Sequence, residues 1–302
     1  MSGISIFDAA FAGPRAIVRR PVDLLIWYVV MVLISAGMVY IVSDILGPSL
    51  GQLQALRAAG PQADPTVVLP ILSKVMSGYM VIAPISVVIG AITTAAANRL
   101  ILRPQDGGVG HFKLGPDELR LMVVLLAIGL IFIVISFVGL IVAGIIGAVI
   151  AGATGGAANP AKMQAGVFIG LIPTLLVFMF LGVRLSLAPA QTMATRSINI
   201  FGSWSLTRGR FWPILGTYVI GFVIYVVVAV IVGVIGKSLG GAVNASGMPI
   251  DLSSSSNLLK PETFGYILLN AVGQVASLLL LGCPGADLYR QIAERPAQAE
   301  AF

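Results

Sequence analysis

The residue types that usually carry catalysis or metal binding are scarce in this sequence. The chain has one histidine, His111, and one cysteine, Cys283. A histidine-based metal site needs several ligands, and a single cysteine can form neither an internal disulfide nor a cysteine-based metal site. No nucleophile elbow, Walker, zinc-protease or dinucleotide-binding motif occurs in a suitable context. We therefore expect no catalytic residue, no cofactor and no metal, and we predict that the protein is not an enzyme.

Two polar side chains inside the last long apolar run share one helical face. Asn270 and Gln274 are four residues apart, a spacing that places both on the same side of a helix. Such residues either bond between helices or line a substrate path. We favour an inter-helix hydrogen bond and keep a substrate contact as the alternative. The apolar runs hold almost no ionisable residues away from their ends, which argues against transport coupled to protons or sodium ions.

Arginines near the ends of the apolar runs form the third set of candidates. A cation near a helix C-terminus complements the helix dipole and can reach a lipid phosphate. A simpler alternative is that these arginines only fix the orientation of the chain in the membrane. The candidate headgroup contacts are Arg19, Arg20, Arg99, Arg103, Arg184, Arg208 and Arg210.

The elements that must position these residues are membrane-spanning helices. Of the 302 residues, 58% are hydrophobic and only 10% are charged, whereas soluble domains have about 25% charged residues. The mean hydropathy is +1.00. Each apolar run is long enough to cross a hydrocarbon core of roughly 30 Å. We predict an all-α polytopic membrane protein, one domain over 1–302, with spans at roughly 22–42, 79–102, 117–151, 165–187, 212–236 and 263–289.

The placement of basic residues predicts the orientation of the chain. With six spans, 13 of the 18 lysines and arginines face the side on which the N-terminus lies. Dividing the long third run into two spans would destroy this asymmetry, so that run is one span, either a single long helix or a broken one. The excess of positive charge predicts that both termini are cytoplasmic. It also explains the formal net charge of +6 without a nucleic-acid partner, for which no basic helix or stacking platform is present.

Regular spacing indicates an internal repeat. Three outbound spans begin near Pro21, Pro116 and Pro213, which are 95 and 97 residues apart, and proline suits the first helical turn. Apolar residues recur on one face of segments 3–13 and 189–212, as in interfacial helices. We predict three hairpin units, each an interfacial helix followed by two spans. The alternative is that any helical hairpin has such helix starters and basic exits.

Small residues recur at every fourth position of the third run. The row consists of Gly139, Ala143, Gly147 and Ala151. Small side chains let helices approach closely in a membrane. We expect this helix to be a packing centre, or alternatively a face that forms a homodimer.

Two stretches carry a family resemblance. Residues 183–190 read VRLSLAPA, and residues 203–212 read SWSLTRGRFW; residues 114–120, LGPDELR, add to the likeness. This pattern resembles the membrane domain attached to some bacterial glycerophosphoryl diester phosphodiesterases, and related stand-alone inner-membrane proteins of unknown function. The resemblance implies a six-span domain in the bacterial inner membrane. It does not extend to the hydrolase activity, because the chain has no room for the phosphodiesterase barrel.

The function we expect follows from these observations. We predict a non-catalytic inner-membrane protein that organises membrane lipids or partner proteins, with a homodimer or another membrane protein as the partner. The alternative is a transporter or lipid-moving protein that uses a cavity between helical hairpins. A cleft that reaches Asn270 and Gln274 would favour this alternative.

Overall fold

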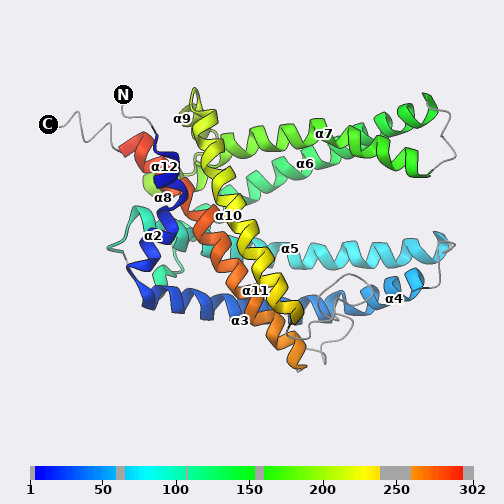
Figure 1. Ribbon diagram of the computed structural model, residues 1–302, viewed down its shortest axis with the longest axis horizontal. Helices are drawn as coiled ribbons and strands as arrows, with labels where there is room; N and C mark the ends of the chain where they lie inside the picture. Colours follow the sequence, from blue (N-terminus) through cyan, green and yellow to red (C-terminus); the bar gives the residue numbers. More distant parts are fainter. Residues whose placement is uncertain (1–3, 59–64, 107, 154–159, 239–259, 295–302) are drawn as a thin grey trace.

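A computed structural model describes residues 4–58, 65–106, 108–153, 160–238 and 260–294 (Figure 1). Within these ranges the chain is helical and contains no strand, and six helices are long and apolar enough to cross a membrane. The all-α, six-span prediction is confirmed, and the chain is a multi-pass membrane protein. The spans are α3 (Pro21–Ile45), α5 (Pro65–Leu102), α6 (Pro116–Ala153), α7 (Pro160–Leu185), α10 (Phe211–Ser238) and a composite last span that begins with α11 (Pro261–Ser277).

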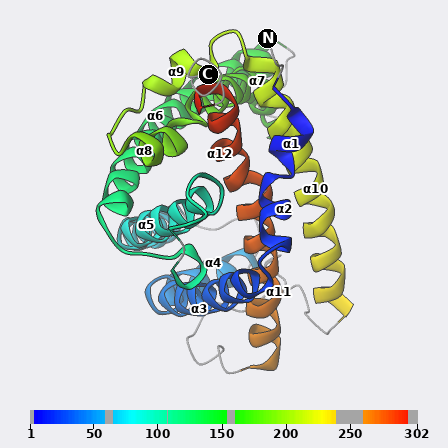
Figure 2. The same ribbon diagram turned by 90° about the vertical axis from the view of Figure 1, so that its left-hand side faces the viewer.

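The last span changes its winding in the middle. After α11 the chain continues through the π-helical turn η3 (Leu278–Gly282) into α12 (Cys283–Tyr289) and η4 (Arg290–Glu294). Every residue of α12 is buried. Figure 2 shows why: α12 lies inside the molecule, and it contacts α5 and the short helices α1, α2 and α8.

Short helices gather at one end of the molecule (Figures 1 and 2). They are α1 (Ile6–Ala10), α2 (Ala12–Val18), η1 (Val109–His111), α8 (Ala188–Thr195) and α9 (Gly202–Thr207). We call this the basic end, because the arginines of segments 15–20, 99–120, 184–210 and 290 lie there. The remaining short helix, α4 (Gly47–Ala58), lies at the opposite end against α5. The helices predicted in segments 3–13 and 189–212 are therefore present.

The third apolar run forms one continuous helix. At 1.5 Å per residue the 38 residues of α6 extend about 57 Å, well beyond the roughly 30 Å hydrocarbon core. Helix α5 also has 38 residues and begins at Pro65, earlier than the predicted start at 79. Figure 1 shows α5, α6 and α7, together with α4, reaching beyond α10 and α11 at the end opposite the basic end.

The row of small residues on α6 packs against α7 within the chain. Gly139 faces the Thr174 side chain, and a methyl group added at Gly166 would lie 2.9 Å from the Cα of Gly147. Similarly, a methyl group at Gly170 would lie 2.7 Å from the Cα of Ala143. The expected packing centre is therefore the contact between α6 and α7. Because α7 covers this row of small residues, the row is not available as a homodimer face.

The three consecutive pairs of spans pack differently. Helices α6 and α7 meet along their length, and α10 packs against α11, as hairpins do. In contrast, α3 makes its main contacts with α11 and touches α5 at few points. The regular spacing in the sequence therefore does not correspond to three equivalent hairpins.

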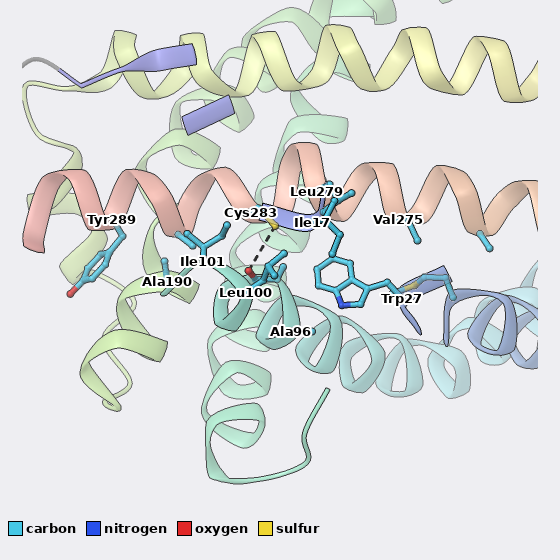
Figure 3. Packing of buried hydrophobic residues seen from close by; sticks show 14 residues of the cluster. Ile17, Trp27, Ala96, Leu100, Ile101, Ala190, Val275, Leu279, Cys283 and Tyr289 are labelled. Atoms are coloured by element: carbon cyan, nitrogen blue, oxygen red, sulfur yellow. Dashed lines mark hydrogen bonds between the residues drawn. The ribbon is translucent and has the colours of Figure 1, made fainter. Parts of the chain in front are cut away.

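The largest hydrophobic cluster lies near the basic end, where α2, α3, α5 and α11–α12 meet (Figure 3). Trp27 is fully buried there, and the Cys283 thiol donates to the carbonyl oxygen of Ala97 at 3.8 Å. Gly13 brings α2 so close to η3 that an added methyl group would lie 2.2 Å from the carbonyl oxygen of Leu279. This cluster anchors the N-terminal helices on the last span.

Candidate functional site

The segment between α5 and α6 folds back into the basic end and buries the histidine. Gly110 and His111 both have positive φ angles, of 62° and 65°. A methyl group at Gly110 would lie 2.6 Å from Cγ2 of Ile26, so glycine is required for space as well as conformation. The indole Nε1 of Trp27 donates to the Gly110 carbonyl at 2.7 Å. The turn is therefore fastened to α3.

His111 is held in one neutral form by two neighbours from the start of α3. Arg20 Nη1 lies 3.1 Å from His111 Nε2, and a guanidinium can only donate, so Nε2 is the acceptor. The ring proton is then on Nδ1, which is 3.5 Å from Asp23 Oδ2. Burial lowers the pKa of His111 from its usual value; Asp23 opposes this shift, while Arg20 and Arg99 add to it. A neutral, buried imidazole in this position fixes the loop.

Arg99 at the end of α5 forms a buried ion pair with Glu118 in the first turn of α6. Their side chains are only 5% and 7% exposed. Arg99 Nη1 also donates to the His111 carbonyl at 3.2 Å. A lipid headgroup cannot reach a side chain enclosed in this way. The predicted headgroup contact is therefore wrong for Arg99, because Glu118 holds its guanidinium inside the protein.

Arg103 joins α5 to α6 and α8. It contacts Asp117 at 3.2 Å and donates to the Met193 carbonyl at 2.5 Å, and its side chain is 19% exposed. Asp117 also pairs with Arg120 at 2.8 Å. Both terminal nitrogens of Arg103 are thus bonded within the protein.

Arg184 at the end of α7 is covered by aromatic rings. Its guanidinium carbon lies 5.2 Å from the ring centre of Phe180 and 5.3 Å from that of Trp204. It also donates to the Thr207 hydroxyl at 3.3 Å. Cations over aromatic faces are stabilised by the ring quadrupole. Arg184 therefore fastens α9 to α7.

The other four predicted headgroup arginines are accessible. Arg19, Arg208 and Arg210 are exposed, and the side chain of Arg20 is 38% exposed. Arg210 donates to the Leu206 carbonyl at 3.2 Å. Within the described part of the chain, the side chains of Arg19 and Arg208 make no hydrogen bond or ion pair. These two side chains have their donors available for a ligand.

A cavity of about 670 Å³ lies beside α11, between α10, α3 and α5. It extends from Pro261 at the beginning of α11 to Leu278, where η3 begins. Asn270 and Gln274 are both in its wall. Glycines on α10 and α11 leave the space open. The lining consists of Met31, Ile89, Thr93, Tyr225, Ala229, Val232, Gly233, Gly236, Pro261, Glu262, Gly265, Tyr266, Leu269, Asn270, Gly273, Gln274, Ser277 and Leu278.

Polar groups run along α11 within this wall. Asn270 Nδ2 donates to the Tyr266 hydroxyl at 3.4 Å, and Gln274 Nε2 donates to Asn270 Oδ1 at 2.6 Å. Gln274 Nε2 also donates to the Ser35 hydroxyl of α3 at 2.9 Å. The preferred reading of Gln274, an inter-helix hydrogen bond, is therefore present in the structure. The side-chain carbonyl oxygen of Gln274 takes part in neither of the two bonds that its Nε2 makes.

The chemistry available in the cavity is that of a neutral binding site. Glu262, near the start of α11, is the one charged side chain among the described lining residues. In the described part of the chain no three His, Cys, Asp or Glu side chains are grouped so that they could hold a metal ion. Apolar walls with a line of hydroxyl and amide groups can bind an apolar chain that carries an uncharged polar linkage.

Comparisons with known proteins find no match: no protein-family model, no curated protein and no solved structure corresponds to this chain. The resemblance to the phosphodiesterase-associated membrane domain stays a prediction.

Sequence reasoning missed two parts of these sites. It did not pair Glu118 with Arg99, although both lie at predicted helix ends. It also missed the cavity residues contributed by other spans, such as Tyr225 on α10 and Thr93 on α5. The ion pair could have been predicted from the sequence, since Arg99 and Glu118 flank the same short connection between two spans. The cavity could not, because its wall is formed by residues from several spans, and local sequence does not show how these spans pack.

Proposed function

We propose that this protein binds a membrane lipid in the cavity beside α11 and acts as a lipid-moving or lipid-handling protein without catalysing a reaction. The observation that carries the proposal is the cavity that reaches Asn270 and Gln274. Its volume lies in the range of about 300–1,000 Å³ that is typical of ligand sites. This observation favours the cavity-based alternative over a protein that only organises lipids at its surface.

The composition of the wall supports a lipid as the ligand. A cavity within the hydrocarbon region of a bilayer is bordered by acyl chains, and its apolar surface is compatible with them. The Tyr266, Asn270 and Gln274 groups supply donors and acceptors for an ester, amide or hydroxyl. The scarcity of charge among the described lining residues disfavours an ionic substrate there.

The other candidate, organisation of lipids by an arginine rim, has less support. Arg99, Arg103 and Arg184 are engaged with protein groups. The accessible arginines, Arg19, Arg20, Arg208 and Arg210, still suit anionic headgroups, and we consider their role further below.

We further propose that the protein resides in a bacterial inner membrane with both termini in the cytoplasm. The gathering of arginines at the basic end supports this orientation under the positive-inside rule. A reporter fused after Phe302 should be active if it works in the cytoplasm. Activity only of a reporter that works outside the cytoplasm would overturn the orientation.

Lipid binding in the cavity can be tested with a lipid that carries a photoactivatable acyl chain. After illumination of the protein in bilayers, we expect labelled peptides from α10 and α11 around Tyr225 and Asn270, and excess unlabelled lipid should suppress this labelling. Peptides around Phe137, which is 67% exposed on α6, provide the control for general contact with lipid. Labelling confined to exposed faces such as that of Phe137 would contradict the proposal.

A further inference from the structure

A second pocket lies at the basic end, between the N-terminal helices and the C-terminal part of the last span. Its volume is about 470 Å³, and α1, α2, the end of α5, and α12 with η4 form its walls. Four arginines line it: Arg15, Arg19, Arg20 and Arg290. Two carboxylates, Asp8 and Asp287, are the only acids among the described residues in its lining. The pocket thus carries an excess of positive charge.

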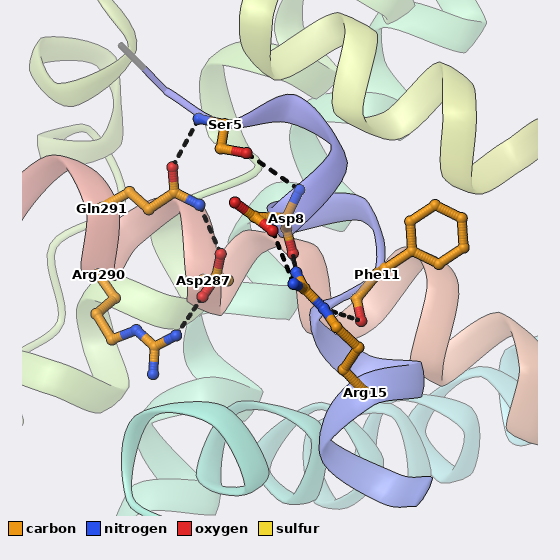
Figure 4. Close-up of polar contacts among 7 residues, drawn as sticks. All are labelled: Ser5, Asp8, Phe11, Arg15, Asp287, Arg290 and Gln291. Carbon is orange, nitrogen blue, oxygen red and sulfur yellow. Dashed lines mark hydrogen bonds and ion pairs between the residues drawn. The ribbon is translucent and has the colours of Figure 1, made fainter. Parts of the chain in front are cut away.

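Both acids are occupied by their own arginines, as Figure 4 shows. Asp8 Oδ1 is 2.7 Å from Arg15 Nη1, and Arg15 Nε donates to the Phe11 carbonyl at 3.3 Å. Asp287 Oδ1 is 2.5 Å from Arg290 Nη2. These pairs neutralise two of the four positive charges and hold both arginines at the wall.

A hydrogen-bonded chain fixes the pocket's frame between the two ends of the polypeptide. Gln291 Nε2 donates to Asp287 Oδ2 at 2.6 Å, and the backbone N–H of Ser5 donates to Gln291 Oε1 at 3.0 Å. Ser5 in turn caps α1 through a bond from the Asp8 N–H. Residues 286 positions apart therefore hold the two sides of the pocket together.

Arg19 supplies the excess positive charge, and Arg20, although it lies near Asp23, adds guanidinium N–H groups that remain free among the described residues. Arg19 is exposed, and its side chain forms no hydrogen bond or ion pair within the described residues. Arg20 uses Nη1 to contact the Pro104 carbonyl and His111, and the Asp23 carboxylate is 3.9 Å away. Its Nη2 and Nε make no hydrogen bond in the described structure. The apolar side chains of Ala16, Leu100 and Ile101 lie in the same wall, and low-dielectric surroundings strengthen the attraction for an anion.

We propose that this pocket binds a phosphate group, with Arg19 and Arg20 as its direct ligands and Arg15 and Arg290 beside them. Both guanidinium groups keep N–H donors that no described protein group uses, and the planar donor fork of arginine suits phosphate oxygens. The phosphate can belong to a lipid headgroup at the membrane surface or to a soluble phosphate. The pocket is separate from the α11 cavity, since none of its lining residues is shared, so it can be tested independently of the function proposed above.

The variant that tests the site without disturbing the fold is Arg19→Gln. The Arg19 side chain makes no hydrogen bond or ion pair in the described residues that its replacement would break, whereas Arg20→Gln would release the Pro104 segment. Arg208→Gln is the matched control, because Arg208 is an exposed arginine at the same end whose side chain likewise makes no hydrogen bond or ion pair within the described part. Arg19→Glu reverses the charge and should have the larger effect.

The experiment uses the full chain in nanodiscs and has two arms. In the first, inorganic phosphate is titrated into protein in phosphatidylcholine nanodiscs, and binding is followed by calorimetry. In the second, the protein is released from mixed phosphatidylcholine–phosphatidylglycerol nanodiscs, and retained lipids are identified by native mass spectrometry. Binding in the first arm identifies soluble phosphate as a ligand, and binding in the second arm alone identifies a lipid headgroup.

In the arm that shows binding, Arg19→Gln should weaken it about fivefold, and Arg208→Gln should leave it unchanged. Thermal unfolding of each variant confirms that the fold is retained. The proposal is overturned if neither arm shows binding. It is also overturned if Arg208→Gln reduces binding as much as Arg19→Gln, because general surface charge would then explain the result.

Discussion

Arg99 and Glu118 form an ion pair that is almost completely buried, and it joins the end of α5 to the start of α6. The two residues are separated in the chain by the turn that contains His111, and Arg99 also bonds to the His111 carbonyl. The pair therefore holds the two ends of the connection between α5 and α6 together, and the bond to His111 fixes the turn between them. This arrangement gives the arginine a structural role at the basic end.

Removing one partner of this pair should destabilise the protein strongly. Arg99→Ala leaves the Glu118 carboxylate buried without its cation, which should cost about 3–5 kcal/mol. Thermal unfolding can be followed with a thiol-reactive dye, because Cys283 is the only cysteine and is fully buried. Replacing both residues in the double variant R99M/E118L should restore much of the loss, since no unpaired charge then remains. A double variant less stable than R99A would argue against this explanation.

Gly110 should tolerate no side chain. Gly110→Ala forces a residue with a Cβ into a left-handed conformation and also places the Cβ against Ile26. Gly209 also has a positive φ, of 74°, but an added Cβ there meets open space. Gly209→Ala should therefore show only the conformational cost, about 1–2 kcal/mol, and Gly110→Ala should lose clearly more in unfolding measurements. Equal losses would show that the contact with Ile26 relaxes freely.

The buried His111 should make stability depend on pH. Its pKa is lower in the folded protein than its usual value of 6.5, so below pH 6.5 the unfolded chain binds more protons than the folded one. Stability should therefore be highest above pH 6.5 and fall as the pH drops below it. Because His111 is the only histidine, His111→Gln should flatten this part of the unfolding-temperature profile. An unchanged slope in the variant would assign the pH dependence to other groups.

The bond between Gln274 and Ser35 should be measurable as a coupling between α11 and α3. Single variants Gln274→Leu and Ser35→Ala, combined in a double-mutant cycle, should give an interaction energy of about 0.6 kcal/mol, the average for such bonds in a membrane. The expected value is small because the amide also bonds to Asn270. A coupling of zero would mean that the 2.9 Å contact contributes nothing to stability.

The sequence predicted the spans well because each is fixed by local composition. A continuous apolar run in α6 or α10 can only be a membrane helix or a buried one, and its ends are marked by Pro116 or by Trp212 and Pro213. The start of α5 was placed too late, because residues 65–78 are more polar and continue the helix beyond the apolar run.

The candidate sites depend on contacts that local composition does not encode. Seven arginines of similar sequence context were all candidates for lipid contact, but Arg99 meets Glu118 and Arg184 meets two aromatic rings. Only the packing of α5 on α6, and of α7 on α9, distinguishes them from the exposed Arg19 and Arg208. Asn270 and Gln274 were identified from their spacing, while the cavity beside them arises from the crossing of α10 and α11 with the other spans (Figure 1).

The most direct test of the central claim is the retention of lipid by a cavity-filling variant. Gly273→Leu places a side chain into the cavity, where an added Cβ meets open space, and Gly129→Leu makes the same change at an equally open position on α6 outside the cavity. Native mass spectrometry of protein released from bilayers should show a lipid bound to the wild type and to G129L, and its loss from G273L with the fold retained. The same lipid occupancy in G273L as in the wild type would contradict lipid binding in this cavity.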